Sequence, residues 1–485
     1  MGKLKLKGKD LRAIGYPEGP VISIAMNIME KNYKFSEQEE VMNLLQQILA
    51  SPVEYENDAV MGLIARQLMP KQEMEVEAIS LRETGVPFNV FGADQIEEGA
   101  TRQMEQASKL PITVAGALMP DAHAGYGLPI GGVLATENAV IPYGVGVDIG
   151  CRMCLSVFDI DPKELLQREQ YFTRELNEAT LFGSGRQFDD TASHAVLDRK
   201  EFDEIPILKA LQLKAARQLG SSGSGNHFVE FGMVTITEHD PILNLEPGEY
   251  LGLLSHSGSR GLGATVAGHY TKLAKEKRRL PAEASNLAWL NLDEEAGTEY
   301  WLAMNLAGDY ASACHEVIHD KIAHQLGRSP LKRVENHHNF AWKEVHEGRE
   351  VIVHRKGATP AGKDVLGIIP GSMTAPGFIV KGKGQEASLS SASHGAGRKM
   401  SRTAALNTVT HDLLKKTLLQ HGVKLLGGGL DEAPQAYKDI ATVMQSQRQL
   451  IDVLGRFTPR IVKMDGAQPK QWRKGKSDSS IVDGE

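Results

Sequence analysis

Residues 131–150 read GGVLATENAVIPYGVGVDIG, and this β-rich stretch decides how the chain is classified. Further β-rich runs are GEYLGLLSHSGSR (248–260), REVIVHRKGA (349–358) and FIVKG (378–382). Helical stretches lie among them at 162–177, 264–279 and 298–326. Because strands and helices mix without a regular βαβ period, and no G-x-G-x-x-G follows a strand, a Rossmann fold is not indicated. We therefore expect an α+β fold.

The first 80 residues have a different texture. A helix is expected after Pro20, and another is expected from 58 to 69. Between them, Ser36 and Glu39 have the spacing of a capping box in front of a one-face apolar pattern. We expect residues 1–80 to form a small helical bundle, residues 85–466 to form the main domain, and the polar residues 467–485 to form a tail.

Composition places the chain among ordinary soluble proteins and leaves the partner open. The 485 residues are 41% hydrophobic and 24% charged, with 49 glycines and a formal net charge of −7. This length favours two domains, and the charge excludes a histone-like polyanion binder but not a local basic groove. The three cysteines, Cys151, Cys154 and Cys314, are too few for a disulfide framework. With no apolar run of about 18 residues and no signal-peptide core, we expect a cytoplasmic protein without a membrane segment.

Six short segments combine histidine or cysteine with glycine, serine or asparagine. They are MPDAHAGYG (119–127), VDIGC (147–151), GSGNHFVE (223–230), HSGSRG (256–261), NHHN (336–339) and SASHGAGR (391–398). Glycine lets backbone N–H groups approach a ligand closely, whereas histidine beside glycine fills a core poorly. Together the segments predict one site assembled from distant loops.

Five of these side chains form a candidate metal set. Asp148, Cys151, His227, His256 and His338 combine a carboxylate, a thiolate and imidazoles, which suits Zn, Mn, Fe or Co. A thiolate can bridge two cations, so the set could hold a binuclear centre of the kind used in phosphoryl chemistry. Two alternatives stay open: half of a zinc knuckle at Cys151 and Cys154, or histidines that are merely hydrogen-bonded loop residues.

Two further loops suggest phosphate binding. PGSM (370–373) and HGAG (394–397) could turn backbone N–H groups towards phosphate oxygens, although each could also be an ordinary turn. His394, with Arg398 and Arg402 close by, is a candidate nucleophile for a phosphoryl or nucleotidyl group. Asp121 could orient an imidazole, or act only as a turn or cap.

These motifs, in this order, resemble the tRNA-splicing ligase family called RtcB, which are GTP-dependent RNA ligases. The resemblance covers residues 85–466 and rests on VDIGC, GNHF-E, HSGSRG, HHN, RKGA, GIIPGSM, SHGAGR-MSR and AYKDI. It implies an RtcB-like fold, with a mixed β-sheet core surrounded by helices. It also implies two Mn²⁺ ions, bridged by Cys151 and held further by Asp148, His227, His256 and His338.

The resemblance also implies a reaction. His394 attacks GTP and becomes guanylylated, and the GMP passes to an RNA 3′-phosphate that derives from a 2′,3′-cyclic end. A 5′-hydroxyl then seals the strand, in tRNA splicing or RNA repair. The implied nucleotide contacts are Asn226, His227, Phe228, Val229, Glu230, His338, Asn339, Pro370, Gly371, Ser372, Met373, His394, Gly395, Ala396, Gly397 and Lys463.

Glu230, from this set, and Tyr437, from the AYKDI motif, also have roles suggested by the chemistry of the side chain. Glu230 could accept hydrogen bonds from guanine N1–H and N2–H₂, which adenine cannot offer. Tyr437 could stack on a base, or only pack. We expect a monomer, and the resemblance suggests an archease-type activator as a partner.

Three features depart from the family pattern. Gly377 stands where the family commonly has a serine, Lys463 is followed by about twenty residues instead of the chain end, and residues 1–80 exceed a minimal ligase. The RNA substrate could therefore differ from spliced tRNA. Alternatives to a ligase are an enzyme that only processes RNA ends, by cyclic-phosphate hydrolysis or guanylyl capping, and a non-catalytic RNA-binding scaffold.

Overall fold

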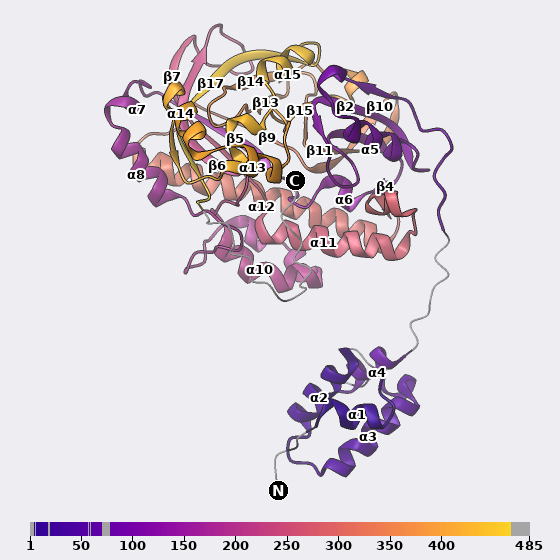
Figure 1. Ribbon diagram of the computed structural model, residues 1–485. Coiled ribbons are helices and arrows are strands. Elements are labelled where there is room, and N and C mark those ends of the chain that lie inside the picture. Colours follow the sequence, from indigo (N-terminus) through magenta and orange to yellow (C-terminus); the bar gives the residue numbers. More distant parts are fainter. Residues whose placement is uncertain are drawn as a thin grey trace. The chain divides into compact units, whose positions relative to one another are not determined.

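The computed structural model describes residues 4, 6–17, 20–56, 58, 60–69 and 78–466. The chain divides into two compact units, Met1–Val76 and Glu77–Glu485, each of which is described by itself (Figure 1). The predicted polar tail, 467–485, lies outside the described residues.

The N-terminal unit is helical. Its elements are α1 (Gly8–Ala13), α2 (Pro20–Asn32), α3 (Gln38–Ala50), the 3₁₀ turn η1 (Pro52–Tyr55) and α4 (Gly62–Leu68). Their apolar faces share one core, which includes Leu11, Met29, Leu45, Ile48 and Ile64. The helices expected after Pro20 and near residue 40 are present, but α1 was missed because six residues carry little periodicity.

Two details of this unit correct the sequence interpretation. Helix α3 has Glu37 at its N-cap, with no side-chain cap hydrogen bond, so the predicted Ser36–Glu39 capping box is wrong. Helix α4 begins at Gly62 rather than at residue 58. Asp58 instead accepts backbone hydrogen bonds from Val60 and Met61, at 2.8 and 2.7 Å, and forms a turn before the helix.

A largely antiparallel sheet forms the centre of the second unit. Its strand order is β13-β14-β17-β6-β7-β5-β9, with β16 paired to β17. The strands are β5 (Arg152–Phe158), β6 (Phe228–Ile236), β7 (Gly248–Ser257), β9 (Lys332–His337), β13 (Leu366–Ile369), β14 (Gly377–Gly382), β16 (Lys424–Leu426) and β17 (Ile451–Met464).

A second sheet has the order β1-β2-β3-β11-β10. Its strands are β1 (Phe88–Val90), β2 (Thr113–His123), β3 (Ile130–Thr136), β10 (Phe340–His346) and β11 (Arg349–Lys356). Two short ladders complete the strands: β12 (Ala358–Pro360) with β15 (Ser391–Ser393), and β4 (Ala139–Val140) with β8 (Leu290–Asn291).

Helices surround these sheets. The longest, α12 (Glu295–Leu326), contacts β5 and β7 of the central sheet and lies beside α11 (Arg260–Lys277) (Figure 1). The other helices of at least seven residues are α5 (Glu98–Ser108), α8 (Glu169–Ala179), α10 (Pro206–Gln218), α13 (Arg402–Thr408), α14 (His411–His421) and α15 (Ile440–Ser446). The predicted α+β class, with a sheet core surrounded by helices, is confirmed.

The stretch 131–150 is only partly β. It contains most of β3 and all of β4, and then α6 (Pro142–Val145), a single turn with proline in its first position. The motif VDIGC therefore lies in the turn between α6 and β5. Along the described part of the chain, no helix combines the length and the apolar character needed to cross a bilayer.

Candidate functional site

The four predicted metal-binding segments meet because their strands are neighbours. In the central sheet β6, β7, β5 and β9 lie side by side and antiparallel. Antiparallel neighbours bring the end of one strand to the start of the next. Four strand ends therefore lie together on one side of the sheet, namely the starts of β5 and β6 and the ends of β7 and β9. Here Met153 and Phe228 both pair with His256.

At this edge the ligand atoms surround the Cys151 sulfur. Sγ lies 3.4 Å from Nε2 of His227 and 3.1 Å from Nε2 of His256. Asp148 Oδ2 is 3.0 Å from Nε2 of His227 on one side. On the other side, the Nε2 atoms of His256 and His338 are 3.2 Å apart. The ligand atoms of Cys151, His227 and His256 all lie within 4.8 Å of one another. Asp148 lies beside His227 and His338 beside His256, so the five side chains can be divided into two groups on either side of the thiol, Asp148–Cys151–His227 and Cys151–His256–His338.

This donor set fits metal ions better than it fits a hydrogen-bond network. The Nε2 atoms of three imidazoles face one another and a sulfur, with a carboxylate oxygen beside them, and these are ligand atoms that borderline-soft metal ions prefer. Burial, followed by nearby histidines, lowers the pKa of His338 well below its usual range, which favours the neutral ring that binds metals. Burial raises the pKa of Asp148, but the contacts with His227 outweigh it and keep this carboxyl ionised.

The glycines of these motifs make room for the ligands. A Cβ at Gly258 would meet Oδ2 of Asp148 at 2.0 Å, and a Cβ at Gly223 would meet Nδ1 of His227 at 1.8 Å. Any side chain at either position would displace a ligand atom. The glycines of HSGSRG and GSGNHFVE are therefore part of the site.

A second group of Cys154, His315 and His319 also has its ligand atoms within 4.8 Å of one another. Here each imidazole nitrogen faces an oxygen. Ser255 Oγ lies 2.6 Å from Nδ1 of His315 and 2.7 Å from Nε2 of His319. The remaining nitrogens face Ser257 O at 3.1 Å and Ser156 Oγ at 2.8 Å. Because these partners satisfy both rings, the group is complete as a buried hydrogen-bond chain.

His394 lies beside the metal-binding groups and is held by Asp121. Its ring centroid is 5.0 Å from that of His338, and its Nδ1 is 2.7 Å from Oδ2 of Asp121. The same oxygen accepts the backbone N–H of His394 at 3.1 Å. Burial raises the pKa of Asp121, but the hydrogen bond and charge of His394 outweigh it and keep the pKa below its usual range. Lys438, from the AYKDI motif, donates to the carbonyls of Pro120 and Ala122 on either side.

One cavity opens next to these groups and collects most of the predicted nucleotide-binding residues. Those in its lining are Asn226, Phe228, Glu230, His338, Pro370, Gly371, Ser372, Met373, His394, Gly395, Ala396 and Gly397. Three further residues line the cavity. They are the metal-ligand candidate His256, the predicted stacking residue Tyr437, and Gly377, where the family commonly has a serine.

Several predicted residues support the cavity without lining it. His227 belongs to the metal group, and Val229 is fully buried on β6 between Phe228 and Glu230, so it faces the opposite side. Asn339 has a left-handed backbone (φ 57°), and its side-chain oxygen accepts from Gly357 N at 2.7 Å. Asn339 therefore stabilises the loop at Gly357 and does not form part of the cavity wall.

Lys463 is the predicted residue that the structure does not bring to the cavity. The neighbouring residues of β17, Val462 and Met464, line the cavity, so alternation turns Lys463 to the other face. There its Nζ donates to three carbonyls at 3.3 Å, and burial lowers its pKa to about 8. The structure therefore does not bring the implied nucleotide contact Lys463 to the cavity, because adjacent side chains of a strand point to opposite faces.

Gly377 is not forced by packing. A Cβ there would meet Pro370 Cα at 3.4 Å and Ile369 O at 3.5 Å, which are ordinary contacts. A serine would therefore fit at position 377, where glycine contributes no side chain to the cavity wall.

A charged cluster at the cavity wall was only partly foreseen. Arg398 and Arg402 pair with the buried Glu432, which also accepts from the hydroxyl of Tyr437. The Arg398 guanidinium lies 5.3 Å from the centre of the Tyr437 ring. Glu432 carried no signal in the sequence, because an acidic residue in a short 3₁₀ turn is usually exposed. Tyr437 is thus held by Arg398 and Glu432, and its ring forms part of the wall.

Glu230 is the other acidic residue of the cavity. It is 4% exposed, and burial raises its pKa well above the usual range. A carboxyl held there without a compensating cation is costly to ionise. Such a group is suited to a ligand that supplies hydrogen-bond donors.

The chain is similar to known proteins over most of its length. The family model described as tRNA-splicing ligase RtcB matches residues 103–465. The RNA-splicing ligase RtcB of Escherichia coli (strain K12) is 32% identical over 399 residues, covering 74% of this chain and 92% of that protein. The tRNA-splicing ligase RtcB of Thermococcus kodakarensis is 31% identical over 456 residues, covering 77% and 94%. The N-terminal helical unit lies outside the residues matched by the family model.

Proposed function

Because this chain belongs to the RtcB family of tRNA-splicing ligases, we propose that it joins RNA ends through a guanylylated His394, with GTP and two Mn²⁺ ions. The substrates are RNA ends that carry a 2′,3′-cyclic phosphate or 3′-phosphate and a 5′-hydroxyl. The observation that carries this proposal is the position of His394: it contacts Asp121, lies beside His338 and lines the same cavity as Glu230.

The two groups that share Cys151 would hold the metal ions. Asp148 and His227 would complete one site, and His256 and His338 the other. Bound there, the ions would neutralise phosphate charge and lower the pKa of a bound water. The protein contributes the ligands, and Gly258 and Gly223 leave room for Asp148 and His227.

His394 acts as the nucleophile. Its Nδ1–H donates to Asp121, which makes Nε2 the nitrogen with the lone pair. Nε2 attacks the α-phosphorus of GTP, the N–P bond forms, and the bond to the β-phosphate oxygen breaks to release pyrophosphate. The Asp121 carboxylate stabilises the positive charge that develops on the ring.

The remaining steps transfer and expel GMP. An oxygen of the RNA 3′-phosphate attacks the phosphorus on His394, breaks the N–P bond and forms an RNA(3′)pp(5′)G end. A 5′-hydroxyl then attacks the RNA 3′-phosphorus, GMP leaves, and a 3′,5′-phosphodiester remains. A cyclic end enters after water has opened it to the 3′-phosphate.

Glu230 selects guanine. Its carboxylate would accept both N1–H and N2–H₂, while adenine offers no such pair of donors. A buried acceptor left unpaired by the wrong base costs free energy, so the burial of Glu230 supports GTP over ATP.

The test is covalent labelling. The full chain is incubated with α-labelled GTP and Mn²⁺ and separated under denaturing conditions, beside His394→Ala and beside labelled ATP. We expect label on the wild type with GTP only. Equal label on His394→Ala, or none on the wild type with or without an archease-type activator, would contradict the nucleophile assignment.

A further inference from the structure

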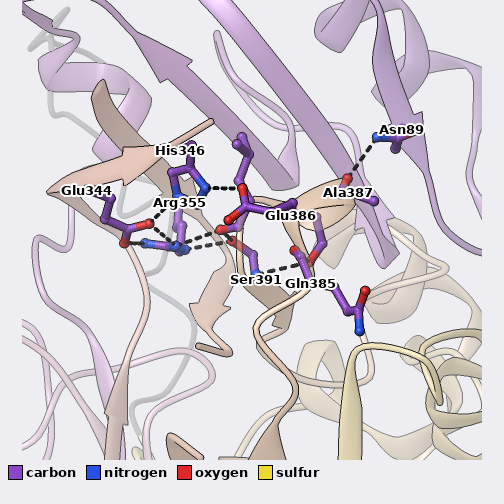
Figure 2. Close-up of polar contacts among 10 residues, drawn as sticks. Asn89, Glu344, His346, Arg355, Gln385, Glu386, Ala387 and Ser391 are labelled. Atoms are coloured by element: carbon purple, nitrogen blue, oxygen red, sulfur yellow. Dashed lines mark hydrogen bonds and ion pairs between the residues drawn. The ribbon is translucent and has the colours of Figure 1, made fainter. Parts of the chain in front are cut away.

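A chain of alternating charges lies behind the segment that carries His394. Arg355 of β11 is fully buried and forms a bidentate pair with Glu344 of β10, at 2.6 and 3.0 Å. Glu344 also contacts Nε2 of His346 at 2.8 Å, and Nδ1 of His346 contacts Glu386 at 2.7 Å. Figure 2 shows His346 between the two carboxylates, beside the Arg355 pair.

The charges in this chain balance. Burial lowers the pKa of His346, but the hydrogen bonds and charges of Glu344 and Glu386 outweigh it and raise the pKa. With both ring nitrogens facing carboxylates, the ring donates from both sides as an imidazolium. Two cations, Arg355 and His346, thus face two anions, Glu344 and Glu386.

Arg355 uses its other donors on the segment before the nucleophile. Its Nε donates to Ser391 Oγ at 2.7 Å, and Nη2 donates to Leu389 O at 2.9 Å. Its guanidinium also lies 4.6 Å from the centre of the Trp342 ring. Together these contacts fix the planar guanidinium group of Arg355 in one orientation. A buried ion pair adds little net stability compared with apolar packing, so the main effect of this pair is on geometry.

The segment that Arg355 holds has an unfavourable backbone. Leu389 and Ser390 both have left-handed φ, 51° and 50°. A left-handed backbone is energetically unfavourable for residues other than glycine, and here two such residues adopt it in succession. Ser391 returns to an extended conformation in β15, where Ser393 pairs with Ala358 of β12. His394 is the next residue, so the turn at 389–390 sets the position of its backbone.

We propose that Arg355, Glu344, His346 and Glu386 are positioning residues that place His394 for attack, through the segment 389–393. Asp121 fixes the ring of His394, while this network fixes the strand from which the ring projects. An in-line attack depends strongly on placement, and a shift of about 1 Å can cost roughly a hundredfold in rate. The proposal deepens the proposed function and rests on it for its kinetic readout.

The test compares variants at two positions of the network with a matched control. Arg355→Lys keeps the charge but loses the fork, and Glu386→Ala removes the most exposed member of the network without opening the core. Arg199→Lys is the control, because Arg199 also forms a bidentate pair, with Glu201 at 3.1 and 2.6 Å, and lines no part of the cavity. Glu386→Gln retains a hydrogen-bond acceptor for His346 and should rescue part of the loss.

Two readouts are measured on full-length protein with unchanged thermal unfolding. In single turnovers, we expect Arg355→Lys to lower the maximal rate of GMP transfer to His394 about tenfold to a hundredfold, with an unchanged KM for GTP. Amide hydrogen exchange in peptides covering 385–397 should become faster in Arg355→Lys and Glu386→Ala and stay unchanged in Arg199→Lys.

The outcomes separate this proposal from the proposed function. Wild-type protein that accepts no GMP would defeat the proposed function, while hydrogen exchange would still decide the role of Arg355. Unchanged exchange at 385–397 in Arg355→Lys, or a rate loss matched by Arg199→Lys, would overturn the positioning role.

Discussion

Oδ2 of Asp121 and Nδ1 of His394 lie 2.7 Å apart, although 273 positions separate them in the chain. The Asp121 carboxyl is fully buried, and the His394 ring lines the cavity. The end of β2 and the end of β15 therefore meet at this contact, and the HGAG loop starts from it. The pair resembles the base-and-orienter arrangement of nucleophilic sites.

Asp121→Asn should slow the transfer of GMP to His394. Loss of the charge weakens both the orientation of the His394 ring and the stabilisation of its cationic form. Removing a residue that orients a functional side chain typically lowers activity on the order of 10- to 100-fold. The rate is measured with saturating GTP and Mn²⁺. Asp240→Asn serves as the control, since Asp240 also accepts two backbone hydrogen bonds, from Ile242 and Leu243 at 2.9 Å each. Equal rates for Asp121→Asn and wild type would remove Asp121 from the mechanism.

Cys151→Ser should disturb both metal positions at once. The shared thiol contacts both groups, and a hydroxyl is a poorer ligand for borderline-soft ions. We expect metal content, measured by mass spectrometry after dialysis against Mn²⁺, to fall from two ions per chain to one or fewer.

Cys154→Ser is the matched control for this measurement, because Cys154 is also buried and lies three residues along the chain. It should retain both ions. Loss of metal from Cys154→Ser would instead make Cys154, His315 and His319 a metal site and contradict their description as a hydrogen-bond chain.

GTP binding should release a proton through Glu230. Burial raises the pKa of its carboxyl well above the usual range, so the free protein holds a proton that the carboxylate must lose to accept guanine. Affinity for GTP should therefore rise with pH up to the raised pKa and level off above it. Calorimetry in two buffers of different ionisation enthalpy counts the released proton.

Glu230→Gln provides the check on this linkage. The amide cannot ionise, so proton release should disappear, and the preference for GTP over ATP should weaken. The sign for stability follows from the same shift: ionising the buried carboxyl destabilises the fold as pH rises above the unfolded pKa. Glu230→Gln should thus raise the unfolding temperature more at pH 8 than at pH 5, and the reverse order would contradict the raised pKa.

Gly377→Ser should be tolerated and should strengthen nucleotide binding. Its Cβ would have only ordinary contacts with Pro370 and Ile369, and the residue lines the cavity. One added hydrogen bond contributes about 0.5–1.5 kcal/mol, which would lower the KM for GTP roughly two- to tenfold. A raised KM with unchanged stability would show that the glycine has its own function.

The sequence was informative where chemistry is tied to short motifs. Residue type and glycine content were enough to predict that Asp148, Cys151, His227, His256 and His338 share a site, because few other roles need these residues together. The α+β class followed from mixed β-rich and helical runs. Sheet order could not be predicted, since the pairing of β9, β5, β7 and β6 depends on contacts far apart in the chain.

The direction of strand side chains and the buried charged residues behind the site were harder to predict. The expected contact from Lys463 depended on a strand face, and a shift of one residue reverses that face. Arg355 belongs to the RKGA motif and Glu432 to no motif, but charged residues are usually exposed, so nothing predicted that they would be buried. Their roles became visible only through their partners, Glu344 and Ser391 for Arg355 and Arg402 for Glu432.

The most direct test of the central claim is sealing of RNA with defined ends. One strand carries a labelled 2′,3′-cyclic phosphate, the other a 5′-hydroxyl, and both are incubated with the full chain, GTP and Mn²⁺. We predict a joined product, seen as a labelled strand of the combined length in which the labelled phosphorus forms the new 3′,5′-phosphodiester, and no such product with His394→Ala. Strands that end as 3′-phosphate or as the RNA(3′)pp(5′)G end, without joining, would contradict ligation and indicate end processing instead.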